Sequence, residues 1–182
     1  MKKYFADNIL LFVLSGIVIL LDQATKYWVR THLTMGEVFL PSFWLSQYVR
    51  ILRWENTGAA GGLFQGYSDV FLVFSLIASL GILAYLPRLP RGDRSLHLAM
   101  GLVLGGAIGN LVDRLIQGYV TDFISIGNLP VMNVADISIL AGILLLLLDI
   151  GLKEQQIKPA QPGQMANTNA EESVSSPEIQ DN

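Results

Sequence analysis

The chain has 182 residues, of which 52% are hydrophobic and 15% are charged, and its formal net charge is −3. The length allows one domain, and the composition is too apolar for an ordinary soluble one. Without cysteine, disulfide bonds and thiolate metal sites are excluded, and we expect no cofactor, no metal and no nucleic-acid partner.

Four segments predict membrane-spanning helices. Residues 70–87 and 95–112 are each 18 residues long and carry no formal charge, which is about the length that crosses a hydrocarbon core as a helix. Residues 8–21 form a third span if the helix continues into DQATKYW, and residues 131–152 form a fourth if it tolerates an aspartate near one end. Each of these two spans therefore carries an acid inside.

An alternative interpretation of residues 1–21 is a cleaved signal peptide, because Lys2 and Lys3 precede an apolar run. No convincing small-residue cleavage site follows. The aromatic pair Tyr27 and Trp28 suits a membrane interface, so a span is the stronger prediction.

The orientation follows from the basic residues beside the spans, because short cytoplasmic flanks are enriched in Lys and Arg. Seven of the 12 basic residues lie on one predicted side: Lys2, Lys3, Arg88, Arg91, Arg94, Lys153 and Lys158. Both termini are expected to be cytoplasmic. Residues 29–68 and 117–130 then face the other side, together with Asp22, Asp122 and Asp136.

Residues 36–66 are predicted to form one or two short strands, since aromatic, β-branched and charged residues partly alternate there. We expect an amphipathic sheet on the membrane surface, which is either a plain surface sheet or a substrate platform. Its lipid-facing side would come from Phe39, Phe43, Trp44, Leu45 and Trp54. The tail, residues 153–182, is polar and without aromatic residues, so it is predicted to be disordered and cytoplasmic.

Ionisable side chains inside spans are functional candidates by default. Asp22 and Lys26 lie four residues apart on one helical face, so an ion pair explains both. Asp113 is followed at once by Arg114, which favours an ion-pair anchor at a helix end.

Asp122 and Asp136 differ, because no basic residue occurs from Thr121 to Ile150. If the chain turns back at GNLP, the two carboxylates can face each other. Two close acids in a poor dielectric cannot both ionise easily, so such a pair holds a shared proton and can hydrolyse a peptide bond. The alternative is that each acid caps a helix or accepts hydrogen bonds from the backbone.

Small and amide residues surround this predicted site. Gly101, Gly105 and Gly109 recur at steps of four, which favours close helix packing. Three asparagines could bind a peptide substrate or hold the carboxylates: Asn56, Asn110 and Asn133. His32 and His97 are too far apart along the predicted helices to share a zinc ion.

Five short motifs, in order, resemble those of the bacterial lipoprotein signal peptidases (signal peptidase II). They are DQATK at 22–26, ENTGAA at 55–60, GGAIGNLVDR at 105–114, YVTDF at 119–123 and NVAD at 133–136. The resemblance covers roughly residues 15–150. Five motifs in this order on a four-span chain are highly specific.

The resemblance implies an aspartic endopeptidase of the cytoplasmic (inner) membrane, with four transmembrane helices and a small outward-facing antiparallel sheet in a domain of residues 1–152. It implies removal of signal peptides from diacylglyceryl-modified prolipoproteins, with cleavage before the lipidated cysteine near the outer face. Asp122 and Asp136 would be catalytic. Residues that bind substrate or support the pair would be Asp22, Asn56, Asn110, Asp113, Arg114 and Asn133. The expected partners are prolipoproteins and membrane lipids, and the expected state is a monomer.

Two other classes compete with a peptidase. A small transporter or proton channel also keeps acids in its spans, but strings them along an aqueous path near the midplane. A membrane scaffold needs the glycines and the sheet but no unpaired carboxylates. Placement of Asp122 and Asp136 side by side favours the peptidase.

Overall fold

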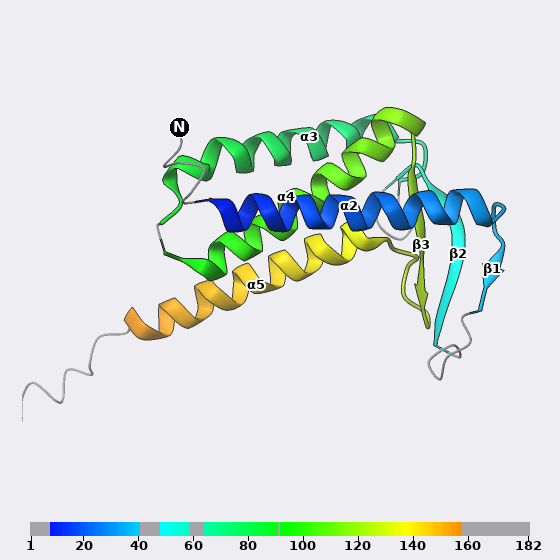
Figure 1. Cartoon of the computed structure of the whole chain (residues 1–182). Coiled ribbons are helices and arrows are strands. Elements are labelled where there is room, and N and C mark those ends of the chain that lie inside the picture. The colour runs from blue at the N-terminus through cyan, green and yellow to red at the C-terminus, as the bar shows by residue number, and fades with distance from the viewer. Residues whose placement is uncertain (1–7, 41–47, 59–63, 91, 158–182) are drawn as a thin grey trace, which may run out of the picture. The chain divides into compact units, whose positions relative to one another are not determined.

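The computed structural model describes residues 8–40, 48–58, 64–90 and 92–157, with the side chains of 155–157 left out. Within these ranges the chain forms long helices and a small sheet (Figure 1). In chain order the elements are α2 (Ile9–His32), β1 (Val38–Phe39), β2 (Val49–Asn56), α3 (Ser68–Tyr85), η2 (Leu86–Arg88), α4 (Arg94–Gln117), β3 (Val120–Ile126) and α5 (Val134–Ile157). Met1–Asp149 form one compact unit, and α5 continues from it into a second unit that begins at Ile150.

The four predicted spans are confirmed. Among the described residues, four helical segments are long and apolar enough to cross a membrane: Ile9–His32, Ser68–Arg88, Arg94–Gln117 and Val134–Glu154. The first runs unbroken past Asp22, as expected of a span rather than of a short leader. The last helix includes residues 153–157, which the sequence had placed in the tail, while residues 158–182 lie outside the described residues.

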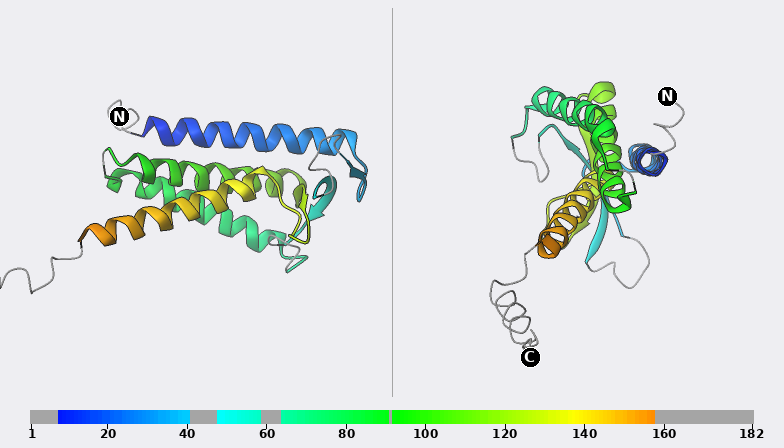
Figure 2. Two further views of the ribbon diagram at one scale, coloured as in Figure 1. Left: turned by 90° about the horizontal axis from the view of Figure 1, so that it is seen from below. Right: turned by 90° about the vertical axis from the view of Figure 1, so that its left-hand side faces the viewer.

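Within the unit Met1–Asp149, α4 packs against both α2 and α3. The sheet stands at the end of this bundle where α2 ends and α5 begins (Figures 1 and 2). Because successive spans alternate in direction, the start of α3 and the end of α4 reach the same end of the bundle. The strands therefore lie beside four helix termini.

Glycines on α4 allow the close approach of α2. A Cβ atom added at Gly105 would lie 2.7 Å from Val18 Cβ, and one at Gly101 would lie 3.0 Å from the Leu11 carbonyl oxygen. The Ser15 hydroxyl donates a hydrogen bond of 2.9 Å to the Gly101 carbonyl across the same interface. The predicted packing role of the glycine ridge is confirmed.

Alanine at position 105 is expected to lower the free energy of unfolding by about 1–3 kcal/mol, because its methyl group overlaps backbone and side-chain atoms of α2. The matched control is Gly16→Ala on α2, where an added Cβ meets nothing within 4 Å. That control should be neutral or stabilising by up to about 1 kcal/mol. Thermal unfolding in detergent measures both, and equal midpoints would contradict this packing.

The sheet is antiparallel, with the order β1-β2-β3. The strands of residues 36–66 were predicted, whereas β3, in the connection between α4 and α5, was not. Phe39 and Trp54 are exposed, as expected of a lipid-facing side, but Phe43, Trp44 and Leu45 lie outside the described residues.

The chain enters and leaves β3 through two glycine turns. Gly118 ends α4 in the left-handed region at φ 77°, and its N–H donates to the Arg114 carbonyl. Gly127, at φ 53°, begins the predicted reversal at GNLP. After it, Met132 returns to pair with Ile124, with backbone hydrogen bonds of 2.7 and 2.9 Å. This return places the first turn of α5 beside β3.

Candidate active site

Asp122 lies on β3 and is 1% exposed. It is opposite Trp54 in the register of β2, and strand periodicity places Asn56 on the same face as Trp54. Asn56 Nδ2 donates to Asp122 Oδ2 at 2.9 Å, and Asn133 Nδ2 donates to Asp122 Oδ1 at 2.7 Å. Neutral amides therefore hold each oxygen of this buried carboxylate.

Asp136 lies in the first turn of α5, which Asn133 caps. Asn133 Oδ1 accepts from the Asp136 N–H at 2.8 Å, and Asp136 Oδ2 accepts from the Asn133 N–H at 3.4 Å. This reciprocal arrangement is a capping box. Asp136 Oδ1 also accepts from Asn110 Nδ2 at 2.8 Å. Asp136 therefore caps α5, as the alternative interpretation expected. It also contacts Asn133, the residue that binds Asp122.

Asn133 joins the two carboxylates, since its side chain binds Asp122 and its backbone binds Asp136. Neither aspartate forms an ion pair with another described residue. Burial, and next the negative charge of Asp136, raise the pKa of Asp122 from 3.8 to about 7. The arrangement can therefore hold a proton near neutral pH, which acid–base chemistry requires.

A second buried cluster surrounds Lys26, which is completely buried. Its ammonium group lies 2.7 Å from Asp22 Oδ2 and 3.3 Å from Asp113 Oδ2. The predicted pair of Asp22 and Lys26 is confirmed. Asp22 also accepts a hydrogen bond of 2.9 Å from the Ala135 N–H, so α2 holds the start of α5.

The predicted pairing of Asp113 with its neighbour Arg114 is wrong. Asp113 pairs with Lys26 and with Arg30 NH1, each at 3.3 Å, and accepts the Thr121 N–H at 3.0 Å. Consecutive helical residues point about 100° apart, so the two side chains leave α4 on different faces. The anchoring role of Asp113 stands with different partners.

Arg114 instead faces α3 and the end of β2. Its NH2 donates to the Gly58 carbonyl at 3.0 Å, and its guanidinium lies 5.6 Å from the centroid of the Phe71 ring. It is 9% exposed. Arg114 therefore connects α4 to the chain that follows Asn56.

Asn110 connects the two clusters. Its Oδ1 accepts from Lys26 Nζ at 2.9 Å and from Asn133 Nδ2 at 3.2 Å, which leaves its Nδ2 to donate to Asp136. The ammonium group can only donate, so it fixes which end of the amide faces the carboxylate. Sequence reasoning assigned Lys26 only as a partner of Asp22. The four-residue spacing of Lys26 from Asp22 could not reveal this second contact.

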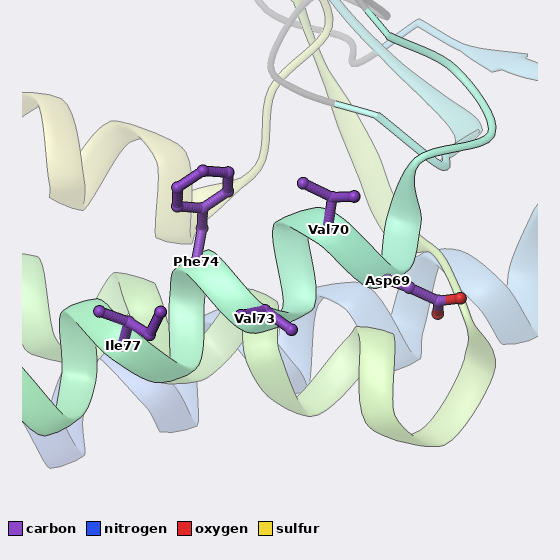
Figure 3. A pocket seen from close by; sticks show the side chains of 5 residues that line it. All are labelled: Asp69, Val70, Val73, Phe74 and Ile77. Carbon is purple, nitrogen blue, oxygen red and sulfur yellow. The ribbon is translucent and has the colours of Figure 1, made fainter.

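Two apolar grooves lie near this end of the bundle. One, of about 490 Å³, follows α3, where Figure 3 shows Val70 and Phe74 projecting from the same side of the helix. The other, of about 350 Å³, follows α5 and is lined by Met132, Asp136, Ile139, Leu140 and Ile143. Only the α5 groove includes one of the two candidate carboxylates.

The structure thus brings together all eight residues predicted for the site. Asn110 joins the cluster around Asp122 and Asp136 to the cluster around Lys26. Arg114 lies beside them, against Gly58 and Phe71. In the part of the chain that the structure describes, no three His, Asp or Glu side chains are grouped to hold a metal ion. Fold and site define a class: a multi-pass membrane protein with two linked aspartates that can perform acid–base chemistry.

Comparisons with known proteins identify the family within that class. The model of the family described as Signal peptidase (SPase) II matches residues 14–152. A lipoprotein signal peptidase of Shouchella clausii is 41% identical over 141 residues, covering 76% of this chain and 91% of that protein. One from Bacillus subtilis is 36% identical over 155 residues, covering 81% and 99%.

A solved structure agrees with this assignment. A bacterial membrane enzyme determined by the in meso method at 2.3 Å resolution is 27% identical and superposes with a TM-score of 0.75. It covers 83% of this chain, and 92% of that chain is matched. This chain belongs to the signal peptidase II family of aspartic peptidases.

Proposed function

We propose that the chain removes signal peptides from diacylglyceryl-modified prolipoproteins by cleaving before the lipidated cysteine, and that Asp122 and Asp136 carry out the hydrolysis. The observation that supports these roles most strongly is Asn133, which contacts both carboxylates while neither forms an ion pair with a cation among the described residues. A transporter would need acids distributed along a path. Here the other buried acids of the described ranges, Asp22 and Asp113, are each paired with cations.

In this mechanism the carboxyl pair holds one proton. The ionised member takes a proton from a water molecule as that water attacks the scissile carbonyl carbon. The protonated member donates to the carbonyl oxygen, where negative charge develops, and the proton later passes to the leaving amine. Asn56, Asn110 and Asn133 orient the two carboxylates through the donors described above.

The substrate's apolar part is proposed to lie in the α5 groove. The groove is lined by aliphatic side chains and by Met132, and Asp136 lies at its wall. An apolar segment bound there would bring its polar end to the carboxylates. This arrangement allows lateral entry from lipid.

The basic flanks of the spans support cytoplasmic termini and an active site near the outer face of the cytoplasmic membrane. The sheet and both aspartates then lie on the outer side, where a signal peptide leaves the bilayer. Both carboxylates and the residues that hold them come from one chain, so a monomer suffices for this mechanism.

Cleavage is expected to fall at alkaline pH. Because the pKa of Asp122 is raised to about 7, the pair loses its shared proton as the pH rises through that value. The logarithm of kcat/KM should then decrease with a slope of about −1 above about pH 7. Rates with a lipidated precursor from about pH 5 to about pH 9 measure this limb. Constant kcat/KM across the whole range would contradict a shared proton.

The proposed substrate class is tested with two precursor peptides of identical sequence, one diacylglyceryl-modified at its cysteine and one unmodified. Purified protein in detergent should release the signal peptide from the modified precursor only, with the new amino terminus at the cysteine. Mass spectrometry identifies the cleaved bond. Equal cleavage of both peptides, or cleavage elsewhere, would contradict the proposal.

A further inference from the structure

Gln65 lies outside the motifs that define the family resemblance and outside the predicted site. It is exposed, in the turn at 64–66 that precedes α3. Its side chain nevertheless reaches Asn56, whose amide contacts Asp122. A surface residue is therefore connected to a buried carboxylate through a single intervening side chain.

The direction of the Asn56 amide matters for Asp122. With its NH2 group toward the carboxylate, as observed at 2.9 Å, Asn56 stabilises the ionised acid. With its oxygen toward the carboxylate, Asn56 could accept only from a protonated acid. Rotation of this amide by 180° would thus change which protonation state of Asp122 is favoured.

Hydrogen bonds around Gln65 fix that direction. Gln65 Oε1 accepts from the Thr57 N–H at 3.2 Å and from the Thr57 hydroxyl at 2.7 Å. The hydroxyl in turn accepts from the Gly66 N–H at 2.9 Å, so its own hydrogen is directed to Gln65. Because both donors require an oxygen, Gln65 must present Nε2 to Asn56 Oδ1, at 3.0 Å.

We propose that Gln65 is a positioning residue for the cleavage reaction, which holds the Asn56 amide with its NH2 group toward Asp122. The inference rests on the proposed function of Asp122. The Gly58 N–H also donates to Asn56 Oδ1, at 2.9 Å, so Gln65 acts together with a backbone donor at that oxygen. Loss of Gln65 weakens the preferred direction but leaves the backbone donor in place.

Among the residues that the structure describes, charged groups of three other elements act on Asp122. They are Asp136 of α5, Lys26 of α2 and Arg114 of α4. On β2, Glu55 pairs with Arg53 at 2.9 Å, and strand alternation places it on the opposite face from Asn56. The hydrogen bonds described for the Gln65 side chain involve none of these charged groups, so a neutral substitution of Gln65 acts on Asp122 through Asn56.

Three variants separate positioning of Asn56 from the simple contact between Gln65 and Thr57. Gln65→Met removes both the acceptor for Thr57 and the donor to Asn56 without adding charge. Gln65→Glu keeps oxygens for Thr57 but cannot donate to Asn56 when ionised. Thr57→Val removes the hydroxyl contact but keeps the Thr57 N–H that orients Gln65.

The readout is the alkaline limb of the pH profile of kcat/KM, measured with a lipidated precursor. Gln65→Met and Gln65→Glu should move its midpoint upward by about half a pH unit, because the ionised form of Asp122 loses support. Thr57→Val should move the midpoint less than either Gln65 variant, because the Thr57 N–H still orients the Gln65 amide. An unmoved midpoint in Gln65→Met, a wild-type midpoint in Gln65→Glu, or an equal shift in Thr57→Val would each overturn the positioning role.

A second readout needs no substrate. Infrared difference spectra between each protein and its Asp122→Asn counterpart follow the protonated carboxyl of Asp122 during a pH titration. The same upward shift is expected in both Gln65 variants, and its absence would overturn the inference. If the wild type titrates near pH 7 but does not cleave the precursor, the proposed function fails independently.

Discussion

Asparagine in place of either Asp122 or Asp136 is expected to lower kcat/KM for a lipidated precursor by at least about 100-fold. The amide has nearly the shape of the carboxyl group but can neither take a proton from water nor supply one to the carbonyl oxygen. The fold should persist, since a neutral amide is less costly to bury than a carboxylate. Single-turnover cleavage and thermal unfolding in detergent measure the two effects.

The matched control is Asp69→Asn. Asp69 lies in the first turn of α3, is exposed, and contacts neither candidate carboxylate in any described interaction. This variant should cleave at a rate close to that of the wild type. Retained processing by Asp122→Asn or Asp136→Asn, or an equal loss in Asp69→Asn, would contradict the assigned roles.

Methionine in place of Lys26 is expected to lower the free energy of unfolding by about 3–5 kcal/mol. Lys26 is completely buried and neutralises the buried acids Asp22 and Asp113. Its removal leaves negative charge in a low dielectric and takes away the donor that orients Asn110. Thermal unfolding in detergent measures the loss, and cleavage should fall because Asn110 contacts Asp136.

A second substitution should partly reverse this loss. In the double variant Lys26→Met with Asp22→Asn, the remaining acid Asp113 keeps Arg30 NH1 at 3.3 Å. Arg88→Met is the control, because Arg88 is exposed at the end of η2 and its loss should change stability by less than about 0.5 kcal/mol. A Lys26→Met protein as stable as Arg88→Met would show that the buried cluster contributes nothing.

The helices could be predicted because membrane spans depend on length and apolarity, which are local properties of the chain. The uncharged runs at 70–87 and 95–112 fall within α3 with η2 and within α4. Strand β3 was not recognised for the opposite reason. Its residues pair with β2, which lies far away in the sequence, and the segment VTDFISI shows no clear alternation.

The linkage of Asp122 and Asp136 followed from the missing cations and from the turn at GNLP. The wrong pairing of Asp113 with Arg114 arose because adjacency in sequence was taken for adjacency in space. Partners of buried charges are set by helix faces and helix packing, here of α2 against α4. For the same reason no local pattern could indicate that the Gln65 side chain reaches Asn56, nine residues earlier in the chain.

Cleavage in water enriched in oxygen-18 tests most directly whether the two carboxylates activate water. In a single turnover of lipidated precursor by unlabelled enzyme, one labelled oxygen should enter the new terminal carboxylate of the released signal peptide. Its appearance in every product molecule is the result expected of direct attack by water. An unlabelled first-turnover product, with label found instead on Asp122 or Asp136, would mean that a carboxylate attacks the peptide itself and would contradict this account.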